Sequence, residues 1–445
     1  METSIDVSLP ARVAPDAPDD APVDRPVDAV RPDRATVAVA ATCLLVCMGA
    51  PSTFVALHIG GGQGGPRSWV FLYPFAAVAV VGLVALGRHL TRMPIRSWPM
   101  PIWFVAAYVA WAMLSAAWSV APEVTASAAL TGVGIAAFGC WFGWQLRIDE
   151  QIWAVVIATS VAVLTSAFFI AFAPGIGRMP PRGANPGGEW QGVFGNRNSL
   201  APVCVLGLLG LVALLVSSPS VRRLAFVAPI AVVELVLLRG SGALTSLIAL
   251  ALMSLTVVVL FVVRRLSRTR VPGWLVATVA AASCAAVAAV IFAKLDVLAT
   301  KIGRDPTLSR RRWIWEDVRA LISDRPIRGY GFWAFWERPD LTAATYAHHG
   351  SAYASAHNSV LEVLLGLGVI GLIAYLALGL FVIAGVAAWT WARPSLASWW
   401  WALVVVFVLT QNLMESFVLW HSYIWVLFIA AAFAPYGRAA ESPRW

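Results

Sequence analysis

The stretch WQGVFGNRNSLAPVCVLGLLGLVALLVS spans residues 190–217, and its segment 199–217 carries no charge. A run of that length and polarity is typical of a helix that crosses a membrane. Similar apolar runs fill most of the 445 residues, of which 60% are hydrophobic and 12% charged. Soluble globular proteins have about 25% charged residues. The composition therefore excludes that class and predicts an all-α, polytopic integral membrane protein.

Hydropathy predicts about twelve transmembrane helices of near-spanning length. They are expected at 35–57, 69–87, 101–118, 124–144, 152–173, 199–217, 223–238, 243–263, 274–293, 358–388, 399–414 and 419–434. The segment 223–238 is short and contains Pro229 and Glu234, and Glu415 separates the last two helices.

The other segments complete the expected organisation. Residues 1–34 are acidic and proline-rich, which predicts a disordered tail. A first set of helices covers 35–293 and includes an external loop at 174–198. A large external loop with short amphipathic helices is expected at 294–357, a second set of helices at 358–434 and a short tail at 435–445.

Arginine placement predicts the orientation. One side of the expected bundle carries Arg34, Arg88, Arg92, Arg96, Arg147, Arg222, Arg223, Arg264, Arg265, Arg268, Arg270, Arg393 and Arg438. By the positive-inside rule that side is cytoplasmic, so both termini are expected on the cytoplasmic side of the cytoplasmic membrane.

Basic residues also gather in the two long loops on the opposite, external side. The net charge is +9, but the basic residues punctuate apolar runs and form no single patch, which argues against a nucleic-acid partner. An anionic ligand would explain arginines in 174–198 and 294–357. Pairing with acidic residues of the same loops is the alternative, and Glu189 is expected to pair with Arg182 or Arg197.

The turn Asn196-Arg197-Asn198 begins the expected helix at 199–217. A helix start has free backbone N–H groups and a positive dipole end, which suit a phosphate or carboxylate. Arg197 and Asn198 are therefore candidate ligand-binding residues, although Asn198 or Ser199 could simply cap the helix.

Two segments of the large external loop combine arginines and aromatic residues. Residues 309–323 predict an amphipathic helix in which Trp315 and Val318 share a stripe. The aromatic stretch 325–336, which includes Tyr330, follows it. Its rings either stack on sugar faces or form a belt at the membrane interface.

His357 and Asn358 open the expected helix 358–388 at the external face. A histidine titrates near neutrality and can accept a proton from a hydroxyl group. Isolated histidines are more often structural, and what distinguishes His357 is its neighbours.

Taken together, these segments resemble the O-antigen ligase and polysaccharide polymerase family, particularly its exopolysaccharide polymerases. The resemblance covers roughly residues 100–375. It rests on Trp118-Ser-Val-Ala-Pro122, Gly195 to Asn198, Gly303-Arg-Asp305, Arg311 with Trp315, Pro326 with Gly329-Tyr-Gly331, and His357-Asn358 with Gly368 and Gly371.

The resemblance implies a membrane-embedded C-type glycosyltransferase that acts on polyprenyl-diphosphate-linked oligosaccharides at the outer face of the membrane. It implies His357 as the catalytic base, supported by Asn358, and Arg311 and Arg197 as ligands of the donor diphosphate. Trp315, Tyr330 and Asn198 are further candidate substrate-binding residues.

This chain departs from the family pattern at two of these positions. It has Asn196-Arg197 where relatives often have His-Lys. It also has three consecutive arginines where relatives have one, so Arg312 or Arg310 could replace Arg311 as the diphosphate ligand. On a helix, consecutive side chains point about 100° apart and cannot all meet one ligand.

The resemblance further implies a metal-independent, inverting reaction without a cofactor. Membrane lipid and polysaccharide chain-length or export proteins are the other expected partners. A ligase that transfers finished glycan, a transporter or flippase of lipid-linked glycan, and a non-catalytic assembly protein are the alternatives.

Overall fold

The computed structural model describes residues 32–49, 69–180, 188–266, 308–343, 355–417 and 422–441. Apart from one isolated bridge between Arg178 and Trp190, the regular structure in these ranges is helical. The α-helices are α1 (Arg34–Cys47), α3 (Trp69–Leu90), α4 (Pro101–Leu114), α5 (Pro122–Gln145), α6 (Ile148–Phe172), α7 (Pro174–Gly177), α8 (Arg197–Ser217), α9 (Val221–Ser241), α10 (Leu244–Leu266), α13 (Leu308–Asp324), α15 (Ser359–Ala392), α16 (Leu396–Met414) and α17 (Tyr423–Phe433).

The helices form a polytopic, all-α membrane architecture, as the hydropathy predicts. Among the described residues, seven helices are long and apolar enough to cross a membrane by length and composition. Shorter apolar helices at Arg34–Cys47, Pro101–Ala117 and Tyr423–Tyr436 accompany them. The expected helix at 274–293, most of the tail 1–34 and much of the loop 294–357 lie outside the described residues. The total of about twelve spans therefore stays a prediction.

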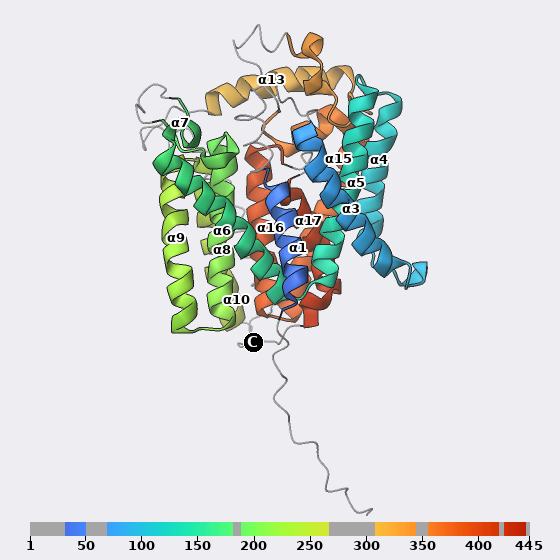
Figure 1. Ribbon diagram of the computed structural model, residues 1–445. Coiled ribbons are helices and arrows are strands. Elements are labelled where there is room, and N and C mark those ends of the chain that lie inside the picture. The colour runs from blue at the N-terminus through green and yellow to red at the C-terminus, as the bar shows by residue number, and fades with distance from the viewer. Residues whose placement is uncertain are drawn as a thin grey trace, which may run out of the picture.

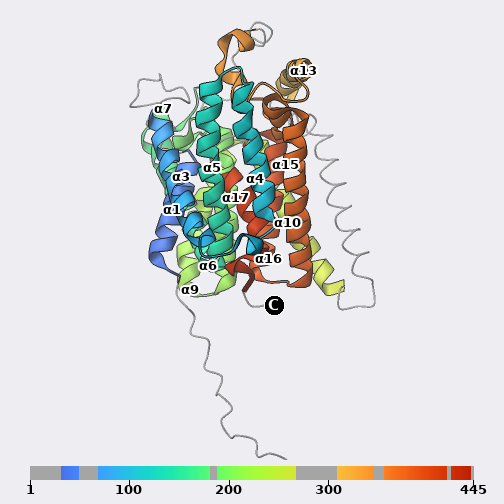
Figure 2. The same ribbon diagram turned by 90° about the vertical axis from the view of Figure 1, so that its right-hand side faces the viewer.

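The bundle has two chemically different ends. Figure 1 shows the helices running side by side with α13 lying across one end, and Figure 2 shows the same arrangement after a quarter turn. We call the end with α13, the start of α8 and the start of α15 the site end. We call the opposite end, where α3 ends and α6, α9 and α16 begin, the arginine end. Its described arginines are Arg34, Arg88, Arg92, Arg96, Arg147, Arg222, Arg223, Arg264, Arg265, Arg393 and Arg438.

Helix α13 is amphipathic, as its sequence predicts. Ile314 and Val318 are buried against the bundle, whereas Trp313 and Glu316 are exposed. The helix packs on α15, so it forms a rigid cover over the site end.

Helix α15 is broken inside its span at Gly368, which has φ 65° and ψ −167°. A break in a membrane helix frees backbone carbonyl groups, and each must find a partner within the protein. The Leu367 carbonyl accepts a hydrogen bond from the indole N–H of Trp111 on α4, at 3.0 Å. The break is therefore satisfied internally.

The segment 326–331, which follows α13, supplies the remaining partners. Backbone hydrogen bonds join Val369 N–H to Pro326 (2.8 Å), Tyr330 N–H to Leu365 (2.9 Å) and Gly331 N–H to Gly366 (2.9 Å). Gly329 has φ +67°, and a Cβ there would lie 2.5 Å from the carbonyl carbon of Gly366. These glycines thus allow a loop backbone to enter a helix break, a role that the sequence alone did not indicate.

Replacing Gly368 by alanine should destabilise the protein. A backbone with φ 65° and ψ −167° is essentially restricted to glycine, and it costs a residue with a Cβ about 1–3 kcal/mol. The new Cβ would also lie 2.2 Å from the Ile327 carbonyl oxygen. We expect a lower thermal unfolding midpoint in detergent.

Gly385→Ala is the matched control, because Gly385 lies in the same helix and a Cβ there meets nothing within 4 Å. An alanine at that place should leave the midpoint unchanged or raise it. Equal midpoints for the two variants would contradict the structural role of the break.

Candidate active site at the end of the bundle

The centre of the site is the carboxylate of Glu415, the residue that ends α16. Glu415 is only 7% exposed, yet charged and polar groups from three separate segments reach it. Its Oε2 lies 2.7 Å from His357 Nδ1, and its Oε1 accepts from Arg311 Nη2 at 2.7 Å and from Asn198 Nδ2 at 2.9 Å. We call Glu415, His357, Arg311 and Asn198 the carboxylate cluster.

The cluster brings together residues that the sequence places far apart. Asn198 is in the first turn of α8, Arg311 is on α13, and His357 precedes α15. The sequence analysis singled out these three residues, and their common partner Glu415 was considered only as a polar residue between two expected spans. Its one signal in the sequence was an acidic side chain that interrupts the apolar run 399–434.

The backbone of His357 has an unfavourable conformation. Its φ is +49°, a left-handed value that is uncommon for a residue with a Cβ. Such backbone persists only where surrounding contacts fix it, and it is frequent at active sites. The side chain remains 28% exposed, so the ring is accessible from outside.

The contact with Glu415 also determines which nitrogen of His357 is available. An ionised carboxylate can only accept, so it selects the tautomer with the proton on Nδ1. The Nε2 atom then carries the lone pair, and no described residue forms a hydrogen bond with it. The ring can therefore accept a proton at Nε2.

Side chains clamp the backbone immediately before His357. The Ala356 N–H donates to Glu362 Oε2 at 2.6 Å, and the Ala356 carbonyl accepts from the Trp315 indole at 2.9 Å. Glu362 also accepts from the indole N–H of Trp336. Trp315 thus helps to position His357 by holding the backbone of the preceding residue, Ala356.

Asn358 fixes the backbone on the other side of His357. Its side-chain oxygen caps α15 by accepting from Leu361 N–H at 3.1 Å, while its amide nitrogen donates to the Leu413 carbonyl at 3.1 Å. Its own N–H donates to Ser416 Oγ at 3.1 Å. Asn358 thus ties the start of α15 to the end of α16.

The side chain of Arg311 reaches the cluster from α13. It also donates to the Met414 carbonyl, and its side chain is 14% exposed. The side chains of Arg310 and Arg312 lie outside what the structure describes. The predicted role of Arg312 therefore stays a prediction.

Charge holds the cluster together. Burial by itself raises the pKa of the Glu415 carboxyl, but the hydrogen bond from His357 and the charge and hydrogen bond of Arg311 outweigh burial and lower that pKa. The carboxylate is therefore ionised at neutral pH and balances the positive charge around it.

Arg197 lies beside the cluster without joining it. Its guanidinium pairs with Glu189, one of the two pairings expected for that carboxylate. The start of α8 is capped by Asn196, whose side chain accepts from Asn198 N–H at 2.8 Å. Asn198 is thus free to use its side-chain amide on Glu415.

Tyr330 lies apart from these groups. It is 5% exposed and packs with Ile314, Val318 and Phe335, and its hydroxyl donates to the Leu321 carbonyl at 3.1 Å. The structure therefore gives Tyr330 a packing contact, and its predicted contact with substrate has no support from this geometry. No group of three or more histidine, cysteine, aspartate or glutamate side chains in the described ranges could hold a metal ion.

Residues 229–376 match the family model described as O-antigen ligase. The chain contains an O-antigen ligase family domain. It is accordingly a membrane glycosyltransferase-type enzyme of polysaccharide biosynthesis. No curated protein matches the chain. The O-antigen ligase domain includes Arg311 and His357, whereas Asn198 and Glu415 lie outside the matched residues.

Trp315→Phe should slow glycan transfer by this protein. The variant keeps an aromatic ring but leaves the Ala356 carbonyl without its donor, and a lost hydrogen bond of about 0.5–1.5 kcal/mol corresponds to roughly 2- to 12-fold. The transfer rate should fall within that range while the KM for the lipid-linked donor stays unchanged.

Trp313→Phe is the control, since Trp313 is on the same helix but 48% exposed. The positioning role of Trp315 would be refuted by equal rates in both variants.

Proposed function

We propose that this protein polymerises polyprenyl-diphosphate-linked oligosaccharide repeat units at the outer face of the cytoplasmic membrane. The observation that carries the proposal is the His357–Glu415 pair with Arg311 on the same carboxylate. This arrangement combines a base that is accessible to a hydroxyl group with a cation that can approach a phosphate.

His357 is the proposed general base. The acceptor hydroxyl gives its proton to Nε2 while its oxygen forms a bond with the anomeric carbon of the donor sugar. The bond from that carbon to the diphosphate oxygen breaks, and the diphosphate leaves with the electron pair. Glu415 stabilises the imidazolium that forms, and solvent at the exposed ring edge removes the proton.

Arg311 and Arg197 are the proposed ligands of the diphosphate. A fixed guanidinium stabilises charge that develops on a leaving phosphate through paired hydrogen bonds. Arg311 is already anchored by Glu415 and the Met414 carbonyl, so little conformational entropy is lost when it meets the donor. Arg197 supplies a second positive charge at the start of α8.

The orientation in the membrane follows from the arginine end. By the positive-inside rule the arginine end is cytoplasmic, and so are both termini. The site end then faces outward, where lipid-linked glycans provide the energy for polymerisation. Chain-length or export proteins are proposed partners at that face.

Direct displacement predicts inversion at the anomeric carbon. The test is to incubate the purified protein in lipid with a polyprenyl-diphosphate-linked repeat unit and to analyse product size and configuration. A ladder of inverted products supports polymerisation. Retained configuration would contradict direct displacement, and transfer of intact glycan to a separate acceptor without a ladder would identify a ligase. Movement of the substrate across the bilayer without bond formation would identify a flippase.

A further inference from the structure

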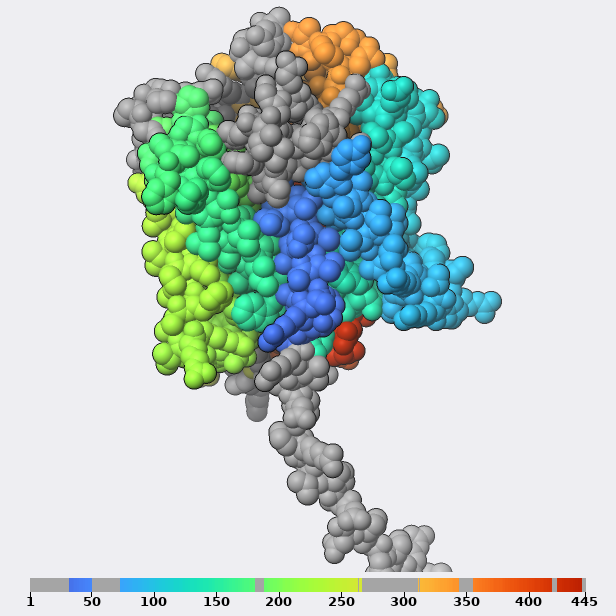
Figure 3. All heavy atoms as spheres, in the orientation of Figure 1, coloured from blue at the N-terminus to red at the C-terminus, as the bar shows by residue number. Residues whose placement is uncertain are grey.

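A groove of about 560 Å³ runs along the side of the bundle between α1 and α6, away from the carboxylate cluster. Figure 3 shows α1 on the visible face of the molecule, beside α6. The groove is lined by Pro32, Arg34, Val37, Ala38, Ala41, Thr42, Leu45, Trp153, Ile157, Ala158 and Val161. Its volume is within the range of sites for small molecules.

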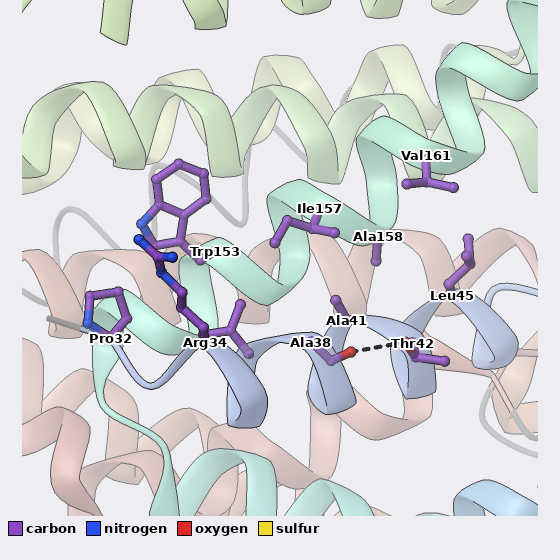
Figure 4. A pocket seen from close by; sticks show the side chains of 11 residues that line it. Pro32, Arg34, Ala38, Ala41, Thr42, Leu45, Trp153, Ile157, Ala158 and Val161 are labelled. Atoms are coloured by element: carbon purple, nitrogen blue, oxygen red, sulfur yellow. Dashed lines mark hydrogen bonds between the residues drawn. The ribbon is translucent and has the colours of Figure 1, made fainter.

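The walls are apolar and suit a hydrocarbon chain. The groove is open because the side chains of Ala38, Ala41 and Ala158 are small. Ile157 and Val161 form part of its wall on α6. The hydroxyl of Thr42 donates to the Ala38 carbonyl at 2.9 Å, so it is used within α1 (Figure 4). The Thr42 hydroxyl is therefore already paired and is not available to a ligand.

The length of the groove corresponds to one leaflet. It extends along α1 from Arg34 to Leu45. At a rise of 1.5 Å per residue this distance is about 16 Å. Half of the hydrocarbon core of a bilayer is about 15 Å. One acyl chain that enters from the arginine end would fill it.

A positive charge marks that end of the groove. Arg34 is exposed and forms no ion pair with any described residue, and Figure 4 shows its guanidinium beside the Trp153 ring. The neighbouring carboxylate of Asp33 accepts from Ala35 N–H and the Thr36 hydroxyl, so it is used to begin α1.

The other charged groups nearby also have partners. Arg147 pairs with Asp149 at 2.6 Å. Glu150 is 4% exposed and accepts from the backbone N–H groups of Asp33 and Arg147. Among the described residues that line the groove, Arg34 is the charged one, and no ion pair with another described residue occupies it.

We propose that the groove binds one anionic phospholipid of the cytoplasmic leaflet, with an acyl chain between α1 and α6 and the phosphate on Arg34. The leaflet rests on the orientation proposed above. A basic residue near the cytoplasmic surface attracts anionic lipid by about 1 kcal/mol. The polyprenyl donor does not fit this place, because its diphosphate would lie at the arginine end, far from His357.

The test uses full-length protein in nanodiscs of equal parts phosphatidylglycerol and phosphatidylcholine, with retained lipids identified by native mass spectrometry. Wild type should retain one phosphatidylglycerol in preference to phosphatidylcholine by about fivefold. Arg34→Gln should lose that preference. Ala38→Phe, which fills the groove, should lose the retained lipid of either headgroup.

Arg96→Gln is the matched control, because Arg96 is also at the arginine end but does not line the groove. It should behave as wild type. Equal retention of phosphatidylglycerol by wild type and Arg34→Gln would overturn the proposal. So would preferential retention of a polyprenyl phosphate added to the nanodiscs, or lipid binding that appears only after deletion of residues 1–31. None of these measurements depends on glycan transfer, so the lipid proposal can fail without the proposed function.

Discussion

His357→Ala is expected to lower the rate of glycan transfer by roughly 10²–10⁴-fold, the usual contribution of a positioned general base. A sugar hydroxyl has a high pKa and attacks poorly while it keeps its proton. Nε2 of His357 is the accessible acceptor that Glu415 prepares, and alanine provides none. The rate of product formation from a purified lipid-linked donor measures this effect. The donor should still bind, because Arg311 remains.

His89→Ala is the control for His357→Ala. His89 lies at the arginine end, where its ring packs edge-on against Trp144. Its loss should leave the transfer rate within a few fold of wild type. If His357→Ala kept the wild-type rate in protein of normal stability, His357 would not be the base.

Glu415→Gln should lower the rate of glycan transfer by about 10²-fold or more, although it replaces only one carboxylate oxygen with an amide nitrogen. A glutamine amide can donate to Nδ1 of His357 and thereby favour the tautomer whose Nε2 carries the proton, which cannot act as a base. The substitution also removes the charge that balances Arg311 and the imidazolium of the reacting state. We therefore expect slower transfer and a raised KM for the donor.

The pH dependence provides an independent readout for Glu415. Its pKa is lowered in the folded protein, so the stabilising pairing is complete above the usual carboxyl range and is lost as the pH falls through the lowered pKa. The thermal unfolding midpoint of wild type should therefore fall as the pH drops through the lowered pKa of Glu415. Glu415→Gln should lack this acidic fall in the midpoint. Glu316 is an exposed carboxylate on α13, so Glu316→Gln is the control. It should retain both the wild-type transfer rate and the wild-type fall of the unfolding midpoint at acidic pH. If Glu415→Gln matched this control, the pairing would have no role in transfer.

The fold could be predicted from the sequence to the extent that each element is defined locally. Uncharged apolar runs define membrane helices by their own length, so each expected span within the described ranges has a helical counterpart. Helix α9 extends over Val221–Ser241, beyond the expected 223–238 and through Pro229. The break at Gly368 could not be predicted, because it requires a partner segment at 326–331 that hydropathy does not detect.

The site could be predicted only in part, for a related reason. His357, Arg311 and Asn198 each carry a local signal, such as a helix start or an unusual arginine. Glu415 does not, because its role arises from contacts with residues 58, 104 and 217 positions away in the chain. An acidic residue between two apolar runs is equally compatible with a short loop. Three-dimensional packing was needed to identify it as the shared partner.

The choice among Arg310, Arg311 and Arg312 illustrates the same limit. Sequence spacing shows that the three side chains must diverge on a helix, but it does not show which one faces the bundle. In the structure Arg311 lies on the same stripe of α13 as the buried Ile314 and Val318 and reaches Glu415, while the side chains of Arg310 and Arg312 lie outside the described residues.

The most direct test of the central claim is the size profile of lipid-linked and surface glycan in cells that express His357→Ala at the wild-type level, compared with wild type and a deletion. We predict that single repeat units accumulate on the lipid carrier and that surface polymer is lost, as in the deletion. Full-length polymer retained on the carrier would keep His357 as the base but make the enzyme a ligase. A wild-type profile in His357→Ala cells, where the deletion has a defect, would contradict the assignment of the carboxylate cluster as the transfer site.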